Sequence, residues 1–247
     1  MTLDEVIPWG RSFEEYRRMF ALTEGDLDGT VLGCGDGPAS FNVEATSLGH
    51  TVVSCDPIYA FSAAEIARRI EQCYDTVIAQ VKQNPDGFVW THFRDPDHLG
   101  QCRLAAMRTF LADFETGKQK GRYVVASLPT LPFEKGRFSL ALASHLLFLY
   151  STHLTLDFHI AAILELLRVA EELRIYPLLG LDRQWSPHVS PVRGHLLRAG
   201  FRVEIVAVEY EFQRAEDHAG NRMMRIRRNA VVPDGNAPEL ACDPGNG

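Results

Sequence analysis

The sequence predicts an α/β fold organised around a mostly parallel β-sheet, and two observations support this. Short apolar, β-branched runs over 30–32 and 51–55 flank a helical stretch over 38–48, so they form a βαβ unit with parallel strands. Beyond residue 121, strand-like and helix-like segments alternate as far as residue 228. With 247 residues, 46% of them apolar, the chain can bury a sizeable core as one domain.

The composition narrows the classes of protein that fit. The net charge of −7 weighs against a protein whose main task is to coat nucleic acid. No apolar run approaches the ~20 residues of a membrane-spanning helix, and the acidic N-terminus lacks the apolar core of a secretory signal. The five cysteines are scattered without a CxxC pair, which is typical of a reduced protein without structural zinc. We therefore expect a cytoplasmic protein with no metal site and no membrane contact.

The segment over 57–121 contains no strong strand and is predicted to be a helical insertion between the second and third strands. A capping box at 62–65 opens a helix whose apolar residues follow helical spacing to Val81. A turn-rich break over 84–96 precedes a second helix over 97–114. A simple crossover needs only about a dozen residues, so we expect this insertion to lie near the strand ends as a lid.

The remaining elements follow from periodicity and from capping residues. The predicted strands cover 30–32, 51–55, 123–126, 138–144, 175–179, 202–208 and 222–228. The predicted helices outside the insertion cover 12–22, 38–48, 156–173 and 191–199. We expect residues 1–230 to form a single domain, and the Pro-, Gly-, Asn- and Asp-rich tail over 231–247 to be disordered.

A glycine-rich turn, VLGCGDGPAS over 31–40, lies between the first strand and the first helix of the βαβ unit. A dinucleotide fingerprint needs a third glycine where this chain has Pro38, and a P-loop needs a lysine that is absent. The pattern that fits is G-x-G-x-G at Gly33, Gly35 and Gly37, which lets the backbone approach a ligand. Asp56 ends the next strand, where a carboxylate can accept both hydroxyls of a ribose. The sequence therefore predicts a nucleoside-containing cofactor.

The glycine turn, Asp56 and the segment LPFEKGRFSLALAS together resemble the class I S-adenosylmethionine (SAM)-dependent methyltransferases. The stretches PWGRSFEEY, VVSCDPIY, SHLLFLYS and YEFQR are also similar to a bacterial methyltransferase-like group of unassigned substrate. The resemblance implies a Rossmann-like, seven-stranded, mostly parallel sheet with a C-terminal antiparallel hairpin strand. It also implies that SAM is the cofactor and that the chain is a transferase acting on a methyl group.

The resemblance assigns roles to particular positions. The loop against the methionine and ribose of SAM is implied at Gly33, Cys34, Gly35 and Gly37. The ribose, the adenine and the methyl-transfer cleft are implied to contact Asp56, Pro57, Ile58, Ser127, Leu128, Ser144, His145 and Leu146. An N-terminal helix often covers the cofactor in this family. Arg11 is therefore either a partner of the methionine carboxylate or a surface arginine.

Three departures from the family pattern leave a second hypothesis open. The family usually has acidic residues at the positions of Val31, Ser127 and Ser139. The alternative is therefore a non-catalytic SAM-fold protein with a degenerate pocket that binds a partner. A dinucleotide oxidoreductase is disfavoured by Pro38.

Methyl transfer from a sulfonium needs orientation more than a catalytic triad, and we find no triad. His145 either lies near the transferred methyl or packs at a helix start. His153 and Asp157 share a helix face, but His159 points elsewhere, so a solvated helix start is favoured over a metal site.

The acidic charge and the lid favour a small-molecule acceptor. The residues after the fourth strand, SHLL over 144–147, lack the [ND]-PP-[YF] pattern of DNA amino-methylating enzymes, which argues against that branch. A nucleic-acid partner is therefore disfavoured, while protein and RNA acceptors stay open. The basic cluster within 222–228 is expected to be a solvated strand edge. Trp90, His92, Phe93 and Arg94 are expected either in an acceptor pocket or in the core of the insertion.

Overall fold

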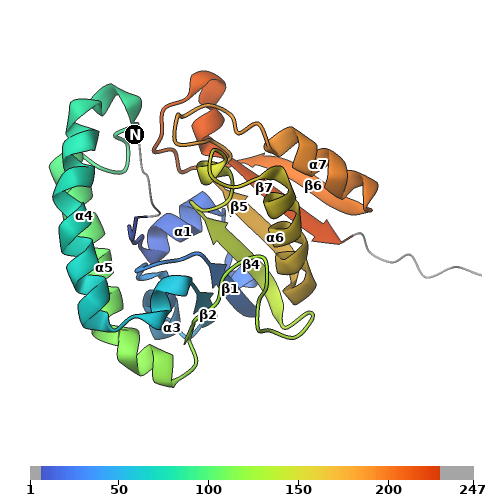
Figure 1. The fold of residues 1–247 in the computed structure, drawn as a ribbon, viewed down its shortest axis with the longest axis horizontal. Helices are drawn as coiled ribbons and strands as arrows, with labels where there is room; N and C mark the ends of the chain where they lie inside the picture. The colour runs from blue at the N-terminus through green and yellow to red at the C-terminus, as the bar shows by residue number, and fades with distance from the viewer. Residues whose placement is uncertain (1–6, 229–247) are drawn as a thin grey trace, which may run out of the picture.

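A computed structural model describes residues 7–228, so the predicted disorder of the tail over 231–247 lies outside the described residues. Seven strands form one sheet in the order β3-β2-β1-β4-β5-β7-β6 (Figure 1). The strands are β1 Thr30–Cys34, β2 Thr51–Cys55, β3 Tyr123–Val124, β4 Phe138–Ser144, β5 Ala170–Tyr176, β6 Phe201–Ala207 and β7 Arg222–Arg228. All pairs are parallel except β5 with β7 and β6 with β7. The predicted Rossmann-like fold with an antiparallel C-terminal hairpin is confirmed.

Helices cover both faces of the sheet and one of its ends. They are α1 Phe13–Met19, α2 Glu24–Leu27, α3 Phe41–Ser47, α4 Ala63–Gln83, α5 Pro96–Gln119, α6 Leu156–Val169 and α7 Val189–Arg198. Alternation along β1 explains the two faces, because successive side chains of a strand point to opposite sides. Leu32 packs in the core beneath α6 and α7, whereas Val31 packs with Tyr16 of α1 and Phe41 of α3.

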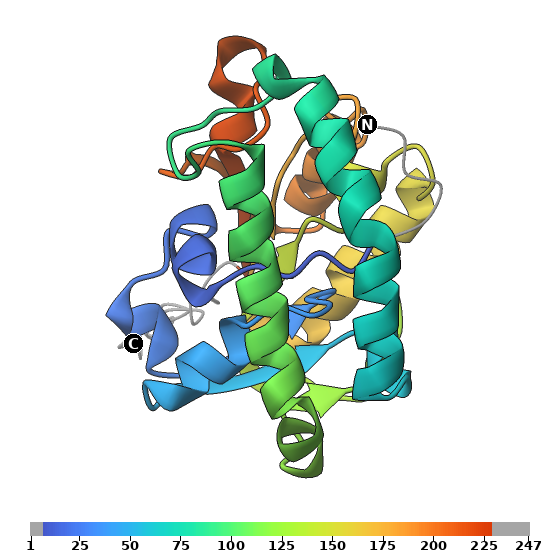
Figure 2. The ribbon, with the colours of Figure 1, turned by 90° about the vertical axis from the view of Figure 1, so that its left-hand side faces the viewer.

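The insertion between β2 and β3 consists of α4 and α5, which lie side by side in both ribbon views (Figures 1 and 2). A third apolar cluster joins them to the sheet edge. It contains Tyr59, Ile66, Ile70, Met107, Phe110, Phe114 and Tyr123. Capping residues fix the starts of both helices: Ser62 forms the predicted capping box of α4, and Asp95 Oδ1 accepts the N–H of His98 in α5. The insertion is therefore a helical hairpin that packs against the β3 edge of the sheet.

The boundary between α6 and β5 differs from the prediction. A helix over 156–173 and a strand over 175–179 are expected from the sequence, but α6 ends at Val169 and β5 covers Ala170–Tyr176. Glu172 accepts a hydrogen bond from Arg225 Nε of β7 over 2.6 Å, and Arg174 donates to Asp26 over 2.5 Å. These contacts with distant segments hold residues with good helix propensity in a strand.

No helix in the described part of the chain combines the length and the apolar character that a bilayer crossing requires.

Candidate active site

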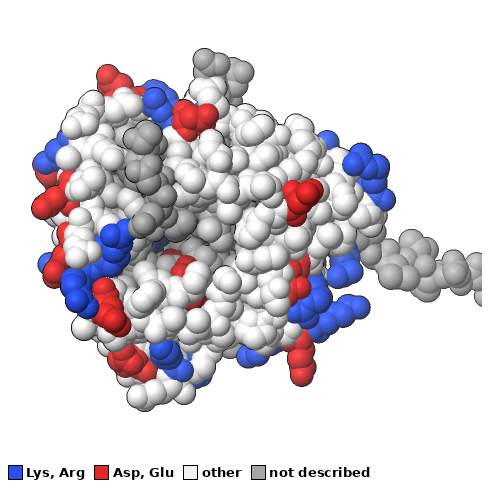
Figure 3. Space-filling model, in the orientation of Figure 1, with Lys and Arg blue, Asp and Glu red and all other residues white. Residues whose placement is uncertain are grey.

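A cavity of about 770 Å³ lies at the carboxyl ends of β1, β2 and β4, between the sheet and α4. In the space-filling view the surface is hollowed beside α4, and acidic side chains show at the floor of the hollow (Figure 3). Ligands of open α/β sheets bind at this edge. The cavity is lined by twelve of the thirteen positions that the sequence assigns to the cofactor and the cleft, namely Arg11, Cys34, Gly35, Gly37, Asp56, Pro57, Ile58, Ser127, Leu128, Ser144, His145 and Leu146. Gly33 does not line it.

The backbone of the glycine turn explains its composition. Gly35 and Gly37 have φ values of +72° and +53°, in the left-handed region that favours glycine. A Cβ added at Gly35 would lie 2.7 Å from Cδ2 of Leu146, whereas the space beside Gly37 is open. At Gly33 an added Cβ would collide with the carboxylate of Asp36. The turn therefore needs glycine both for its curvature and for close packing.

The Asp56 side chain points toward the glycine turn. Its Oδ2 accepts the N–H of Gly37 over 2.9 Å, and its Oδ1 accepts the N–H of Ile58 over 2.8 Å. The hydroxyl of Tyr59 donates to the carbonyl of Gly37 over 2.8 Å. Burial raises the pKa of the Asp56 carboxyl. Each oxygen accepts one backbone N–H, so a second lone pair on each can accept a ligand hydroxyl.

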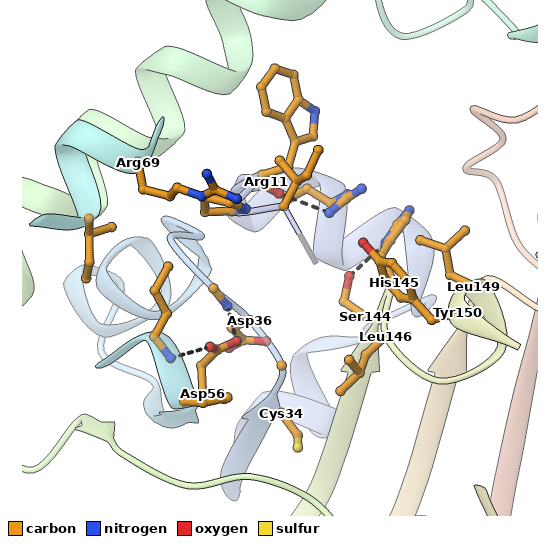
Figure 4. Close-up of a pocket in the computed structure, with 18 of the residues that line it drawn as sticks. Arg11, Cys34, Asp36, Asp56, Arg69, Ser144, His145, Leu146, Leu149 and Tyr150 are labelled. Atoms are coloured by element: carbon orange, nitrogen blue, oxygen red, sulfur yellow. Dashed lines mark hydrogen bonds between the residues drawn. The ribbon is translucent and has the colours of Figure 1, made fainter. Parts of the chain in front are cut away.

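A second carboxylate, Asp36, lies in the middle of the turn and is not among the residues singled out from the sequence. It is 7% exposed, and it accepts hydrogen bonds from Tyr16 Oη over 2.8 Å and from Ser54 Oγ over 2.6 Å. Burial raises the pKa of this carboxyl to about 7. Its partners come from α1 and β2, so no local sequence pattern announces them. Figure 4 shows Asp36 and Asp56 close together at the turn.

Two arginines lie near each other beside α1, and one of them, Arg11, lines this wall of the cavity. Arg103 of α5 is 1% exposed, and its Nη1 donates to Glu15 over 2.5 Å, while Tyr210 Oη donates to the same carboxylate over 2.8 Å. Arg11 Nη1 donates to the carbonyl of Trp9 over 3.1 Å, and Arg11 Nε is buried with no hydrogen-bond partner in the described part of the chain. Burial, together with the charge of Arg103, lowers the pKa of Arg11. One carboxylate therefore faces two cations here, and the excess positive charge favours an anionic ligand group.

His145 lies between this wall and the end of β4 (Figure 4). Its backbone is in the left-handed region with φ +52°, and its N–H donates to the carbonyl of Tyr176 over 2.7 Å. Its Nδ1 lies 2.9 Å from Ser144 Oγ in a hydrogen bond. Burial, with the charges of Arg11 and Arg103, lowers the pKa of the imidazole well below 6.5. The ring is therefore neutral at pH 7.

The candidate metal ligands and the aromatic segment of the insertion do not line the cavity. His159 is buried and packs against His188 with ring centroids 4.7 Å apart, away from the exposed His153 and Asp157. Among the residues described, no three His, Cys, Asp or Glu side chains gather as a metal site. Phe93 packs in the core of the insertion, and His92 stacks on Tyr210 with centroids 5.1 Å apart.

The basic cluster of β7 is partly neutralised by its own sheet. Arg225 Nε donates to Glu172 of β5 over 2.6 Å, and Arg227 pairs with the same carboxylate. Arg228 donates from Nη2 to the carbonyl of Leu167 over 2.8 Å. The arginines of β7 therefore stabilise the antiparallel end of the sheet by contacts with β5 and α6.

No protein-family model matches the chain. Among solved structures, WbdD, a bifunctional kinase-methyltransferase, is 14% identical with a TM-score of 0.47. The similarity covers 92% of this chain but only 42% of WbdD, so this chain spans less than half of that protein. Magnesium protoporphyrin IX methyltransferase (ChlM) from Synechocystis PCC 6803, solved with bound SAM, is 13% identical with a TM-score of 0.40, covering 88% of this chain and 91% of ChlM.

A curated relative is much more similar in sequence. The uncharacterized protein MJ0045 of Methanocaldococcus jannaschii is 30% identical over 229 residues, which cover 92% of this chain and 99% of the relative. An alignment of that length includes the sheet, the insertion and the cavity together. The chain therefore belongs to the same protein family as MJ0045.

Proposed function

We propose that this chain transfers a methyl group from SAM to a small-molecule acceptor. The observation that carries the proposal is the convergence of the Asp56 carboxylate and the glycine turn at one end of the cavity, where Gly37 N–H donates to Asp56 Oδ2 over 2.9 Å. A ribose at this point would meet a charged acceptor for its hydroxyls and bare backbone beside it. ChlM, one of the solved structures to which the chain is similar, is a methyltransferase with bound SAM.

The remaining contacts of such a donor follow from the lining residues. Ile58 and Leu128 would hold the adenine between them, with Ser127 near its edge. The unpartnered Nε of Arg11 would meet the methionine carboxylate, which relieves the excess positive charge beside Arg103. The open space beside Gly37 leaves room for the sugar. The residues present therefore fit SAM.

Bound SAM supplies an electrophilic methyl group, so the acceptor atom bonds to the methyl carbon while the carbon–sulfur bond breaks and the sulfur keeps the electron pair. His145 is the residue proposed to take a proton from the acceptor. When its Nδ1 donates to Ser144 Oγ, its Nε2 carries the lone pair that receives the proton. The lowered pKa keeps this nitrogen free of a proton at pH 7. The surrounding protein excludes water and orients the acceptor for in-line attack.

The alternative function, a SAM-fold protein that binds a partner without catalysis, rests on a different feature. Both oxygens of Asp56 already accept backbone N–H groups, so this carboxylate could serve the turn alone. The serine at position 139 is also structural, because its Oγ donates to the carbonyl of Thr30 over 3.1 Å.

Calorimetry separates the two possibilities and tests the proposal. We expect SAM to bind with one site per chain and to raise the melting temperature, whereas NADPH should do neither. No heat and no thermal shift with SAM at about millimolar concentration would overturn the proposed donor. Mass spectrometry of molecules that co-purify with the protein then identifies the acceptor. An adenosine-containing thioether should accompany it.

A further inference from the structure

The cavity is longer than the donor site described above. Its lining includes both Glu65 and Val81 of α4, which are separated by about 24 Å along the helix at 1.5 Å per residue. The predicted donor contacts on the sheet lie near the start of α4, where the chain passes from β2 through η1 Pro57–Ala60 into the helix. The end of the cavity near Val81 therefore has no role in the proposed SAM site.

This far end has a uniform chemical character. Its lining side chains on and around the second half of α4 are Val77, Val81, Phe88, Leu99 and Phe212. Val81, Phe88 and Leu99 belong to one buried apolar cluster with Phe93, and Phe212 packs against it. The charged lining residues of α4 are Glu65, Arg68 and Arg69, and all of them lie in its first two turns. A ligand group with a full charge would therefore meet no counter-charge among these side chains and would lose its hydration.

The far wall joins the insertion to the segment before β7 by backbone hydrogen bonds. Val89 N–H donates to the carbonyl of Phe212 over 2.8 Å, and Arg214 N–H donates to the carbonyl of Gly87 over 3.0 Å. Figure 2 shows the loop after α4 beside this C-terminal segment. The Arg214 side chain turns to the backbone, with Nε donating to the carbonyl of Asp86 over 3.0 Å. Arg214 therefore supplies no positive charge to the cavity lining.

One polar atom in this wall has no partner. Gln213 lines the cavity, and its Oε1 is buried without a hydrogen bond to any described residue. A buried amide oxygen without a partner is costly, and it becomes satisfied when a ligand donates to it. The wall is thus apolar with a single acceptor.

We propose that the acceptor of the methyl group is an uncharged, predominantly apolar small molecule that binds at this far end and donates a hydrogen bond to Gln213. The proposal rests on the proposed methyl transfer, because donor and acceptor would share one cavity that Ser144 and His145 also line. It excludes sugar phosphates, nucleotides and acidic peptides as acceptors.

Two fluorescent probes test this chemistry. N-phenyl-1-naphthylamine is uncharged, apolar and has one N–H, and 8-anilino-1-naphthalenesulfonate has the same rings and N–H with an added sulfonate. We expect the uncharged probe to bind at one site about tenfold or more tightly than the sulfonate. Saturating SAM should not displace it. Equal affinity for both probes, or displacement by SAM, would overturn the proposal.

Variants locate the probe. Val81→Asp should weaken binding of the uncharged probe by about tenfold or more, since it places a charge in the far wall. Leu48→Asp, at a residue that is 63% exposed at the end of α3, is the control and should not change it. If Val81→Asp does not fold, Val77→Trp fills the same end with an apolar group. Unchanged binding in a folded variant of either kind contradicts the assignment.

The hydrogen bond and the donor site are tested separately. The N-methylated probe, which lacks the N–H, should bind wild type about threefold more weakly, and Gln213→Leu should remove this preference. If wild type binds the N–H probe and the N-methylated probe with equal affinity, Gln213 does not accept a hydrogen bond from the ligand. SAM titration of Val81→Asp by calorimetry should match wild type. SAM binding without probe binding defeats only this inference, whereas probe binding without SAM binding defeats only the proposed donor.

Discussion

The hydroxyl of Tyr16 donates a hydrogen bond to the carboxylate of Asp36 over 2.8 Å and so joins α1 to the glycine turn. Ser54 of β2 donates to the same carboxylate, which therefore links three segments beneath the cavity. Burial, with a smaller contribution from the nearby Asp56, raises the pKa of this group to about 7 from 3.8. The charge state of the turn thus changes close to neutral pH.

This linkage predicts how stability depends on pH. Because the folded pKa of Asp36 is raised, the folded state binds more protons than the unfolded state between pH 3.8 and about 7. The free energy of unfolding should fall as pH rises through this window, by up to ~1.4 kcal/mol per pH unit from this group. Asp36→Asn stays neutral and should lose this contribution. Urea unfolding of both proteins across the window measures it, and parallel pH curves would contradict it.

Asp56 gives the most direct test of the donor site. We expect Asp56→Ala to weaken SAM binding by roughly 1–3 kcal/mol, because ribose hydroxyls lose a charged acceptor. Asp56→Asn keeps an oxygen for the backbone N–H of Gly37 and should lose less. Isothermal calorimetry measures both. The exposed Asp28→Ala serves as the control. A folded Asp56→Ala protein with wild-type affinity would show that the carboxylate serves the turn alone.

Local signals in the sequence are sufficient for most of the fold. The β-strand over 138–144 has the predicted bounds, because its centre over 140–143 is a buried apolar run typical of a central strand. The capping box at Ser62 forms as predicted, and Ser12 forms another at the start of α1. The predicted end of α6 was wrong. Glu172 and Arg174 lie in a strand because they contact β7 and Asp26. Those contacts join residues far apart in the chain.

Some residues of the candidate site can likewise be recognised from the sequence, and others cannot. The glycines and Asp56 are recognisable because spacing along one βαβ unit places them together. The pairs Asp36–Tyr16 and Arg103–Glu15 are not, because their partners come from separate elements and no periodicity relates them. The unpartnered oxygen of Gln213 likewise depends on how the insertion meets the segment before β7.

The ion pair between Arg103 and Glu15 should anchor the insertion to α1. Removing one partner leaves the other charge buried, so Arg103→Met should cost about 3–5 kcal/mol of unfolding free energy. The double variant Arg103→Met with Glu15→Gln should recover part of this loss. The exposed pair Arg18–Glu14 is the control, and Arg18→Ala should cost less than about 1 kcal/mol. Chemical denaturation measures the free energy of unfolding of all three variants. Equal losses for Arg103→Met and Arg18→Ala would show that the buried ion pair does not anchor the insertion.

Titration of His145 tests whether the cleft holds a neutral imidazole. Burial, with Arg11 and Arg103 nearby, lowers its pKa, so the ring should stay unprotonated as pH falls through 6.5. Since the unfolded state then binds more protons, this group should also reduce stability progressively below pH 6.5. Imidazole NMR resonances follow the ring directly. His145→Asn assigns them, because asparagine tolerates the left-handed backbone at this position. The same variant should lower methyl transfer by about 10²-fold or more at unchanged SAM affinity. A ring that titrates at 6.5, or a variant with wild-type turnover, would remove His145 from the proposed mechanism.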